Sequence, residues 1–556
     1  MKRFFQSHRS IIPTSSDTGK SLLSGLPPWV YAVAVTLIAL GLKLGLLAFD
    51  AFPFNADEAI VGLMARHILE GRWPVFFYGQ AYMGSLDASL VALGFALFGQ
   101  KVIIIRVVQI LLYIGTILTT MYLGKRIFGA RESMLFAGLL MAIPTVNVTL
   151  YTTVSLGGYG EALLIGNLLS LISLRIAKNS DVLWPYLAWG FLAGFGFWVF
   201  GLTLVYTIPT AGLILWSLWR TQNQREVLKK FLGLIIALVI GVLPWLGWGL
   251  FHDQGFLIQE LAGSAIAGAS PTDPLAAIGS RILHLLIFGS TVSLGFRPPW
   301  EIRWLSLPLM PFALIVWLII LGYGILSWRR PGPERLGRYL MMGIVFTLLL
   351  GFTLTPFGAD PSGRYFLPLA VPMALLVTNF LVDLKGRYRT GLRVLILLGL
   401  LGFNLWGTIE SAIRNPPGIT TQFDEVTQID HSQDRALIHF LSERGESRGY
   451  SNYWVSYPLA FLSNEDLIFV PYLPYHLDFR YTPRDSRYEP YEDQVAISER
   501  VAYITTHHPA LDEYIRSSFK GLDVRWKEVR IGDYQIFYNL SRVVVPTEIG
   551  LGILSP

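Results

Sequence analysis

Two adjacent carboxylates, Asp57 and Glu58, stand in the stretch NADEAIVGLMARHILEGRWP, shortly after an apolar segment that is long enough to cross a bilayer. The apolar residues that follow them repeat with a helical period, so we predict a helix whose N-cap is Asn55 or Asp57. One interpretation of the pair is capping, because carboxylates are favourable at the N-terminus of a helix. The other is catalysis, because a carboxylate held in a fixed direction can act as a general base.

A second polar cluster follows in the stretch FFYGQAYMGSLDA. Its members, Tyr78, Gln80, Tyr82 and Asp87, offer hydroxyls, an amide and a carboxylate beside small glycines. A sugar needs many directional hydrogen-bond partners, so we predict that these residues bind a sugar or an acceptor. An aromatic belt at the membrane interface explains the same residues equally well.

A third carboxylate, Glu161, ends the glycine-rich turn in SLGGYGEAL. Glycines let a backbone approach a ligand closely. Carboxylates from different loops, here Asp57 and Glu161, can hold a divalent cation such as Mg²⁺ or Mn²⁺, or divide base and orienting roles. Glu161 is equally well interpreted as an N-cap acid on the following helix, so the need for a metal stays open.

A guanidinium group, that of Arg364, lies in the stretch FGADPSGRYFLP at the end of an apolar segment. Its planar fork of donors suits a phosphate. Arg297 and Arg303, in another loop on the same predicted membrane face, could supplement it. The alternative for Arg364 is an anchor to lipid headgroups.

The composition places these side chains in a membrane protein. The chain has 556 residues, is 53% hydrophobic and only 15% charged, and has a mean hydropathy of +0.49, whereas soluble chains carry roughly 25% charged residues. The net charge of +6 is then a topology bias rather than an affinity for nucleic acid. The absence of cysteine excludes disulfides, thiolate metal sites and cysteine nucleophiles.

We predict about eleven membrane-spanning helices. Basic and acidic loops alternate, which places the N-terminal tail (1–28) in the cytoplasm and the loops 50–101 and 251–304 outside. The apolar piece Ser85–Phe98 is too short for a span, so we assign it to the first outer loop as a juxtamembrane or re-entrant helix. The second outer loop contains another semi-apolar piece, Ile282–Phe296. The predicted spans are 29–49, 102–124, 133–151, 161–177, 184–200, 202–219, 231–250, 305–327, 339–356, 366–383 and 392–409.

After the last span, residues 410–556 are rich in charged and aromatic residues. They combine a helical pattern at Asp434–Glu443 with strand-like runs in DLIFVPYL, VAYITTHH and YQIFYNL. We predict a soluble α/β domain on the outer face. The fold class is therefore a polytopic α-helical membrane protein with a C-terminal soluble domain.

The order of these motifs resembles that of the GT-C glycosyltransferases. The resemblance covers 29–409 and is carried by the Asp-Glu pair after the first span, the long first outer loop, GKRIFGARES (124–133) and GRYFLP (363–368). That superfamily includes the family 39 protein mannosyltransferases that use dolichyl-phosphate mannose, the aminoarabinose transferases of lipid A and the rhizobial lipopolysaccharide galacturonosyltransferase-like group. The chain lacks the internal sugar-binding repeat domain of the first group and the Lys-Pro-Pro stretch of the second, where GQAYMGS stands instead.

The resemblance implies an inverting transferase that takes a sugar from a polyprenyl-phosphate donor. By position, Asp57 matches the base, Glu58 an orienting acid, and Glu161 an acid that binds a cation or places the acceptor. Arg364 and Tyr365 match the late motif that contacts the donor phosphate. The acceptor, a lipid, a glycan or a protein, would be glycosylated at the outer face of a bacterial-type inner membrane, in lipopolysaccharide or protein glycosylation of the cell envelope.

Two other functions fit the same pattern. One is a transporter or flippase of lipid-linked glycans, which would place ionisable groups near the midplane of the bilayer on interrupted helices. The other is a ligase or polymerase of surface glycans, which shares the lipid-phosphate donor. The sugar and the acceptor are not identified by the sequence.

Overall fold

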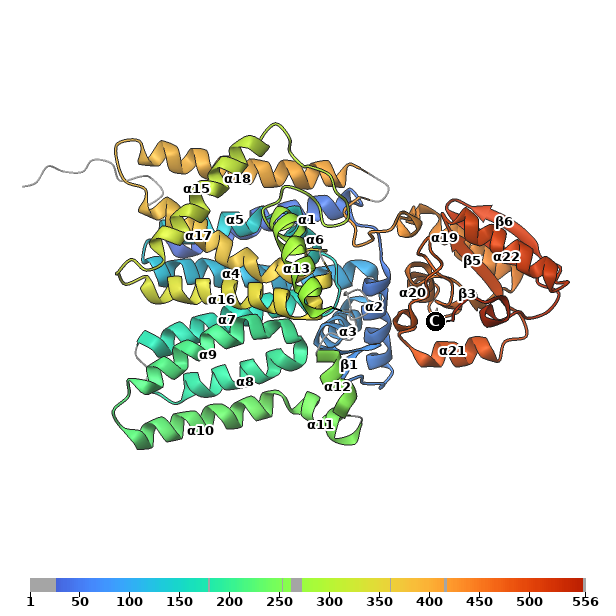
Figure 1. Cartoon of the computed structure of the whole chain (residues 1–556), viewed down its shortest axis with the longest axis horizontal. Coiled ribbons are helices and arrows are strands. Elements are labelled where there is room, and N and C mark those ends of the chain that lie inside the picture. The colour runs from blue at the N-terminus through green and yellow to red at the C-terminus, as the bar shows by residue number, and fades with distance from the viewer. Residues whose placement is uncertain are drawn as a thin grey trace, which may run out of the picture.

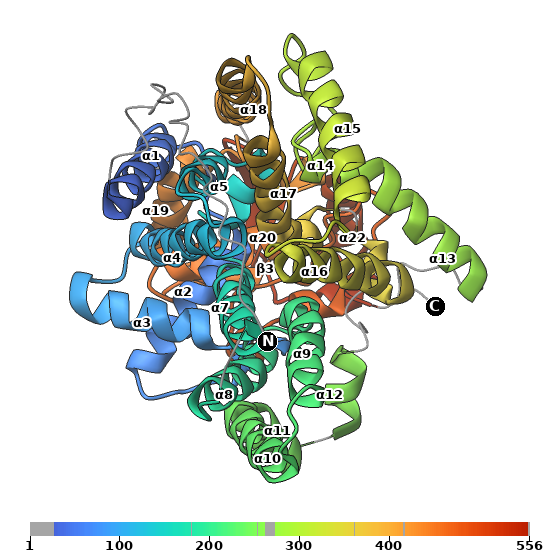
Figure 2. The ribbon, with the colours of Figure 1, turned by 90° about the vertical axis from the view of Figure 1, so that its left-hand side faces the viewer.

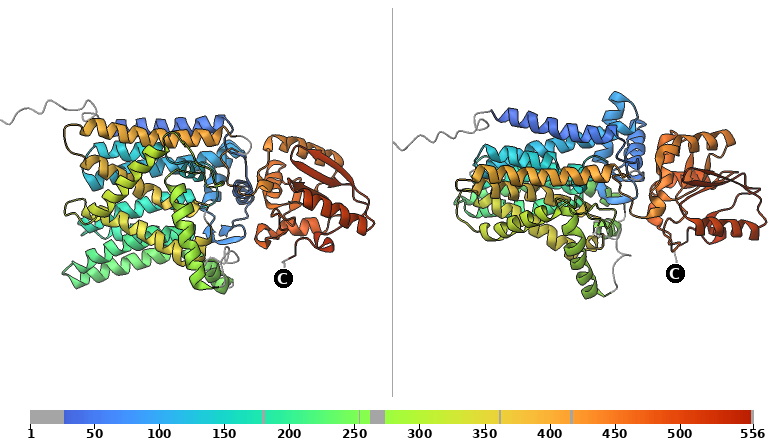
Figure 3. Two further views of the ribbon diagram at one scale, coloured as in Figure 1. Left: turned by 45° about the horizontal axis from the view of Figure 1, so that its top comes forward. Right: turned by 90° about the horizontal axis from the view of Figure 1, so that it is seen from above.

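The structure, a computed structural model, describes residues 27–178, 181–252, 254–261, 273–360, 362–414 and 418–553. These residues form a helical bundle with a sheet-containing C-terminal domain at one end of it (Figure 1). The two further views of Figure 3 show the same division. Almost the whole of the predicted cytoplasmic tail, 1–28, lies outside the described residues.

In the described ranges, nine helical segments are long and apolar enough to cross a membrane, and a bent pair of helices makes a tenth. The two helices of that pair, α10 (Gln224–Gly241) and α11 (Leu243–Phe251), meet at 59°. The nine segments are α1 (Pro28–Ala48), α4 (Val102–Phe128), α7 (Tyr159–Lys178), α9 (Leu204–Trp219) with the turn before it, α13 (Pro274–Leu283) with α14 (Ser290–Ser293), α15 (Met310–Ser327), α16 (Arg335–Leu354), α17 (Ala370–Asp383) with the turn Arg364–Leu369, and α18 (Arg389–Ala412).

The predicted count of eleven spans is not confirmed. The segment 133–151 is broken into α5 (Glu132–Ala142) and α6 (Val146–Tyr151). Pro144 lies at the break, and a proline cannot donate the backbone hydrogen bond that would continue the helix. The segment predicted at 184–200 forms α8 (Trp184–Val199), which has 16 residues.

Together with α14, the helix α13 is long and apolar enough to cross a membrane, although it lies in the predicted outer loop 251–304. Figure 2 shows it running across the view, while α10 and α18 are seen nearly end-on. In Figure 1 it likewise runs across the direction of the long bundle helices. This direction fits a segment that lies along the bundle end, and its assignment to an outer loop stays a prediction.

Glycines allow two bundle helices, α8 and α10, to approach each other closely. A Cβ atom at Gly190 or Gly194 would collide with the carbonyl oxygen of Leu234 or Leu238, and one at Gly241 with that of Phe191. Small residues at such contacts let helix backbones pack in a membrane, where no hydrophobic effect drives association.

The first predicted outer loop, 50–101, is compactly folded. It contains α2 (Ala56–Leu69), the hairpin β1 (Phe76–Phe77) and β2 (Gln80–Gly84), and α3 (Leu86–Phe98). The helices predicted after Asn55 and within Ser85–Phe98 are therefore confirmed. In the second loop, α12 (Gln254–Leu261) lies beside this hairpin at the end of the bundle that faces the C-terminal domain (Figure 1).

The C-terminal domain is built on a five-stranded sheet with the order β4-β3-β5-β7-β6. Strands β4, β3 and β5 pair in parallel, and β7 pairs antiparallel with both β5 and β6. The predicted α/β domain is present, with the helix at Asp434 and a strand in each of the three strand-like runs. Its elements are α19 (Asp434–Arg444), β3 (Arg448–Tyr450), α20 (Tyr453–Leu462), β4 (Ile468–Val470), α21 (Glu489–Ala496), β5 (Ala502–Thr506), α22 (Pro509–Gly521), β6 (Lys527–Ile531) and β7 (Tyr534–Tyr538).

The domain docks onto the bundle through α20, which packs against α2. The ring of Phe461 lies 5.5 Å from that of Phe54, and a Cβ at Gly62 would lie 2.5 Å from the Phe461 ring. Arg66 of α2 pairs with Glu465 at 3.2 Å, and His67 contacts the same carboxylate at 3.0 Å. Because these contacts are buried or half-buried, the C-terminal domain is held in a defined place over α2.

Candidate active site

The N-terminus of α2 holds the two carboxylates in different environments. Asn55 is the N-cap, and its side-chain oxygen accepts the backbone N–H of Glu58 at 3.0 Å. Capping therefore does not require Asp57. Instead, Oδ1 of Asp57 accepts a hydrogen bond from the hydroxyl of Tyr453, at 2.6 Å, and Oδ2 has no hydrogen-bond partner in the described ranges.

Glu58 points into the bundle and has no exposed surface. It forms a two-pronged ion pair with Arg106 of α4, with Nε–Oε1 and Nη2–Oε2 distances of 3.0 and 2.9 Å. Arg106 also donates to the carbonyl oxygen of Phe52 at 3.1 Å. These contacts tie the start of the first loop to α4, so the geometry of Glu58 is that of a structural ion pair. The predicted catalytic role of Glu58 is not tested by these contacts, and they leave it no free oxygen for a substrate.

Arg364 begins the 3₁₀ turn that leads into α17, directly after Gly363, which has a φ of +89°. Its Nε donates to Oδ2 of Asp360 at 2.6 Å, and its guanidinium lies 5.2 Å from the centre of the Tyr365 ring. Its side chain keeps 32% of its surface exposed. The late motif therefore presents a partly exposed arginine side chain whose direction is set by a neighbouring acid.

Tyr82, in the middle of β2, lies near these groups. It is buried, and burial raises the pKa of its hydroxyl. Charged groups from four parts of the chain also act on the pKa of this hydroxyl, namely those of Arg364, Arg487, Glu260 and Asp57. The predicted base and the predicted phosphate-binding arginine therefore share one neighbourhood around Tyr82.

Arg487 and Tyr453 come from the C-terminal domain and were missed by the sequence analysis. The guanidinium of Arg487 lies 5.4 Å from the centre of the Tyr453 ring. With the Gln80 amide oriented so that its oxygen faces Arg487, that oxygen accepts from Nη1 and Nη2 at 2.6 and 2.9 Å. Gln80 is thus brought to the site, where it holds Arg487. No local signal in the sequence distinguishes these two residues from the other aromatic and basic residues of a soluble domain.

Asp485, two residues before Arg487, adds a buried acid to the same neighbourhood. Burial raises the pKa of its carboxyl to about 7, the nearby charge of Asp57 acts in the same direction, and that of Arg487 opposes both. The site therefore contains one acid that is hydrogen-bonded to a tyrosine and a second that is largely enclosed.

Three of the remaining predicted residues lie in buried contacts around this site. Tyr78 shares a 2.7 Å hydrogen bond with Nδ1 of His67 and stacks on Tyr488, with ring centres 4.7 Å apart, so it lies at the docking interface. Asp87 accepts from Gln109 at 2.8 Å and from the hydroxyl of Ser155. Glu161 is buried near Asp87, and neither of its carboxyl oxygens has a hydrogen-bond partner among the residues that the structure describes.

Arg297 and Arg303 are held by other partners. Arg297 donates to Thr291 at 3.0 Å and to three backbone carbonyl oxygens of its own segment. Arg303 pairs with Glu301 and Glu410, at 2.8 and 2.5 Å. The structure does not bring either of them to Arg364, because these contacts occupy them in the second loop and at the end of α18.

In the described residues, the carboxylates of Asp57 and Glu161 lie in different surroundings. No group of three or more histidine, aspartate or glutamate side chains in the described part of the chain could hold a metal ion. Asp57 is engaged by Tyr453, while Glu161 lies with Asp87. The pairing of Asp57 with Glu161 on Mg²⁺ or Mn²⁺ stays a prediction that this geometry does not favour.

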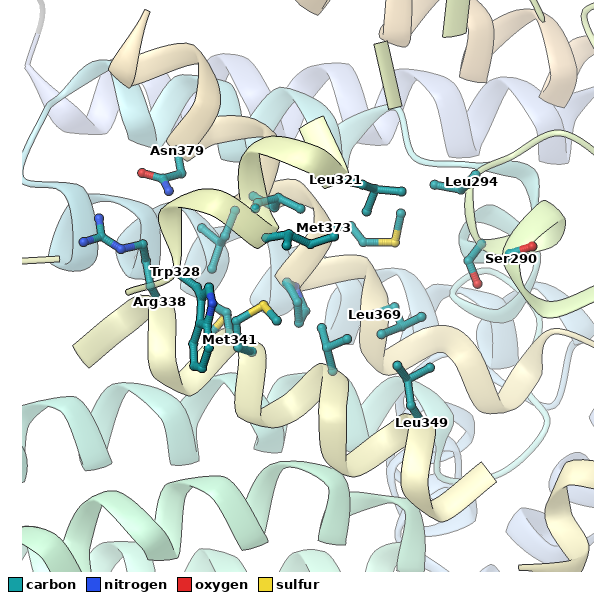
Figure 4. Close-up of a pocket in the computed structure, with 18 of the residues that line it drawn as sticks. Ser290, Leu294, Leu321, Trp328, Arg338, Met341, Leu349, Leu369, Met373 and Asn379 are labelled. Carbon is teal, nitrogen blue, oxygen red and sulfur yellow. The ribbon is translucent and has the colours of Figure 1, made fainter. Parts of the chain in front are cut away.

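An apolar cavity of about 630 Å³ lies inside the bundle, between α15, α16 and α17 (Figure 4). Leu321, Met341, Leu349, Leu369 and Met373 line it, as Figure 4 shows. Its wall also includes Phe366, which is two residues after Arg364 in the same turn. The turn Arg364–Leu369 therefore carries a guanidinium group and also contributes to the wall of the apolar cavity.

Comparison with known proteins points to one architecture. No family model matches the chain. The undecaprenyl phosphate-alpha-4-amino-4-deoxy-L-arabinose arabinosyl transferase 1 of Pseudomonas fluorescens Pf-5 is 25% identical over 404 residues, which are 67% of this chain and 64% of that protein. The match thus spans less than two thirds of this relative's length.

Two solved structures share the fold. ArnT from Cupriavidus metallidurans, bound to undecaprenyl phosphate, has a TM-score of 0.54 at 13% identity and covers 92% of this chain and 98% of its own. The archaeal oligosaccharyltransferase AglB from Archaeoglobus fulgidus, in complex with an inhibitory peptide and a dolichol-phosphate, has a TM-score of 0.50 at 10% identity, with coverages of 88% and 71%. At such identities the likeness concerns the fold. This multi-pass membrane chain therefore has the fold of these two glycosyltransferase structures, as the resemblance to the GT-C group led us to expect.

Proposed function

We propose that the chain is an inverting glycosyltransferase that moves a sugar from a polyprenyl-phosphate donor to an acceptor hydroxyl. The observation that carries this proposal is the surroundings of Asp57. One carboxylate oxygen is fixed by Tyr453, the other has no partner among the described residues, and two guanidinium groups lie around the adjacent Tyr82. A base and a cationic region side by side suit the transfer of a phosphate-activated group.

In the proposed reaction, Asp57 removes the proton from the acceptor hydroxyl. The acceptor oxygen forms a bond to the anomeric carbon, and the bond from that carbon to the phosphate oxygen breaks on the opposite face. The electron pair of that bond leaves with the polyprenyl phosphate, so the leaving group needs no proton. Arg364 stabilises the charge that develops on this phosphate, which is the main electrostatic contribution of the site.

The apolar cavity supports a lipid-linked donor. An isoprenoid chain gains free energy when it leaves water or a polar headgroup region for an apolar wall. Since Phe366 of that wall and Arg364 belong to one 3₁₀ turn, a lipid tail in the cavity would have its phosphate close to Arg364. The names of the relative and of the solved neighbours, which include undecaprenyl phosphate and dolichol-phosphate, agree with this donor class.

The proposed location of the reaction is the outer face of a bacterial-type inner membrane. The alternation of basic and acidic loops supports this orientation, with the N-terminus in the cytoplasm and the C-terminal domain outside. Lipid, glycan and protein acceptors all present the hydroxyl that the reaction requires.

The test uses the full-length protein in nanodiscs with a panel of undecaprenyl-phosphate sugars and envelope extracts as acceptors. Release of undecaprenyl phosphate that depends on the acceptor is the expected result. Asp57→Asn should lower the rate by about 10²–10⁴-fold, because general-base catalysis is typically worth that factor, while its melting temperature stays that of the wild type. An Asp57→Asn variant with the wild-type rate would remove Asp57 from the base role.

A further inference from the structure

Arg487 differs from the other arginines around the site in its partners. Arg364 pairs with Asp360, and Arg484, only three residues away on the same segment, pairs with Glu260. Among the residues that the structure describes, Arg487 forms no ion pair. Its Nη atoms donate to the amide oxygen of Gln80, its face lies on the ring of Tyr453, and its Nε is enclosed without a hydrogen-bond partner.

The direct contacts of this cation do not offset its removal from water, and the charges that favour it act from farther away. Removing a charged group from water costs several kcal/mol unless an opposite charge and hydrogen bonds compensate, and here the contacting groups are neutral. The guanidinium also keeps an unused N–H donor, at Nε. An anionic ligand would supply both the missing charge and the missing acceptor.

The two nearby acids do not fill this role. Tyr453 stands between Arg487 and Asp57, because its hydroxyl holds Asp57 at 2.6 Å while its ring face holds the guanidinium. Asp485 acts on Arg487 through its charge without forming an ion pair. Tyr453 therefore lies between the acid and the cation, whose charges favour each other without forming an ion pair among the described residues.

The position of Arg487 is fixed from both sides of the interface. Its backbone N–H donates to the hydroxyl of Tyr457 at 2.6 Å, and that hydroxyl donates to the carbonyl oxygen of Asp485 at 3.0 Å. On the bundle side, a Cβ at Gly79, which has a φ of +68°, would lie 2.8 Å from Cδ of Arg487. Only a glycine leaves room here for the arginine to reach into the first-loop hairpin.

We propose that Arg487 is a second ligand of the donor phosphate, supplied by the C-terminal domain and acting together with Arg364 across Tyr82. This rests on the proposed function, since it names the groups that bind the donor in the same site. It also gives the C-terminal domain a direct part in the site, because the bundle alone would present only one of the two guanidinium groups.

The experiment measures binding of undecaprenyl phosphate to the full-length protein in nanodiscs, with undecaprenol as the uncharged control lipid. Arg487→Gln should weaken binding of undecaprenyl phosphate about 10- to 100-fold, the factor that corresponds to one hydrogen-bonded charge. Binding of undecaprenol should not change. The matched control is Arg480→Gln, an exposed arginine of the same segment whose side chain contacts His476, and it should bind undecaprenyl phosphate like the wild type.

The outcomes separate this proposal from the proposed function. If the wild type binds undecaprenyl phosphate and Arg487→Gln binds it equally well, the role of Arg487 is wrong and the proposed function stands. If the wild type does not distinguish undecaprenyl phosphate from undecaprenol, both are wrong. Should Arg487→Gln fail to fold, Arg487→Lys decides: a lysine cannot reproduce the planar fork, so affinity should fall, and unchanged affinity would overturn the proposal.

Discussion

The first predicted outer loop and the C-terminal domain meet at Asp57, but they contribute to the site in different ways. The loop supplies the carboxylate from the first turn of α2, whose cap is local to the loop. The C-terminal domain supplies Tyr453, which lies 396 residues after Asp57, and Arg487, which comes later still. Both are brought to the site because α20 docks on α2. One side of the site is made by local sequence, and the other by the interface between two domains.

The same contrast occurs within the Asp-Glu pair. Asp57 faces the C-terminal domain, while Glu58 faces Arg106 inside the bundle. Consecutive residues of a helix point about 100° apart, so two adjacent acids at one N-terminus cannot share one environment. We therefore expect substitution of Asp57 to lower the rate of transfer and substitution of Glu58 to lower the stability of the fold.

The largest effect on stability is expected for Glu58→Gln. This change leaves Arg106 as a buried cation with a neutral partner, and breaking a buried pair by removing one charge costs about 3–5 kcal/mol. The free energy of unfolding, measured by denaturant titration in detergent micelles, should fall by that amount.

The control for Glu58→Gln lies at the other end of the same helix. Glu70 and Arg72 form an ion pair with side chains that are about half exposed, 48% and 51%, and such pairs contribute about 0–1 kcal/mol. Glu70→Gln should therefore have little effect. Equal losses for the two variants would show that Glu58 does not hold the first loop on α4.

An intermediate effect, on the rate, is expected for Tyr453→Phe. The change removes the hydroxyl that fixes Asp57 but keeps the ring that carries Arg487. A hydrogen bond to a charged group is worth about 1.5–3 kcal/mol, so the transfer rate should fall about 10- to 100-fold, with a melting temperature close to that of the wild type. The assay is the same release of undecaprenyl phosphate.

Tyr514→Phe is the matched control for Tyr453→Phe. It removes a hydroxyl of the same domain that donates to the carbonyl oxygen of Ile549 at 2.7 Å, in α22 rather than in the docking helix. Its transfer rate should equal that of the wild type. A wild-type rate for Tyr453→Phe as well would mean that the bundle positions Asp57 without the C-terminal domain.

Much of the fold could be predicted because lipid imposes a strong constraint on sequence. A spanning helix needs about 20 apolar residues, and most of the predicted spans coincide with helices such as α1, α4 and α18. The prediction of a single span at 133–151 was wrong. The helix is interrupted at Pro144, although the residues on both sides of this proline are mostly apolar. The apolar composition of a segment indicates that it lies in lipid or protein, but it does not show where a helix breaks. The break here depends on the missing backbone N–H of one proline.

The candidate site could be predicted only on the side of the bundle. Asp57 and Arg364 attract attention because charges beside apolar spans are costly and rare. Arg487 and Tyr453 lie in a soluble domain, where such residues are common, and their proximity to Asp57 is a tertiary contact without a local pattern. Arg303 shows the opposite error, since it lies in a suggestive loop but is held by Glu301 and Glu410.

The smallest effect, on the pH dependence of stability, is expected for Asp485→Asn on the C-terminal side of the site. Burial raises the pKa of Asp485 from its ordinary value of 3.8 to about 7, so between these two values the folded state binds a proton that the unfolded state has released. Stability therefore falls as the pH rises through this window and stays reduced above it. Asp485→Asn removes this loss, so its melting temperature should exceed that of the wild type by a few degrees at about pH 8 and equal it at about pH 4.

The control is Asp493→Asn, an exposed position on the neighbouring α21, whose melting temperature should follow that of the wild type at every pH. If the melting temperature of Asp485→Asn also follows that of the wild type, Asp485 is more open to water in the folded protein than its burial under the docked domain implies, and the C-terminal side of the site is looser than the bundle side.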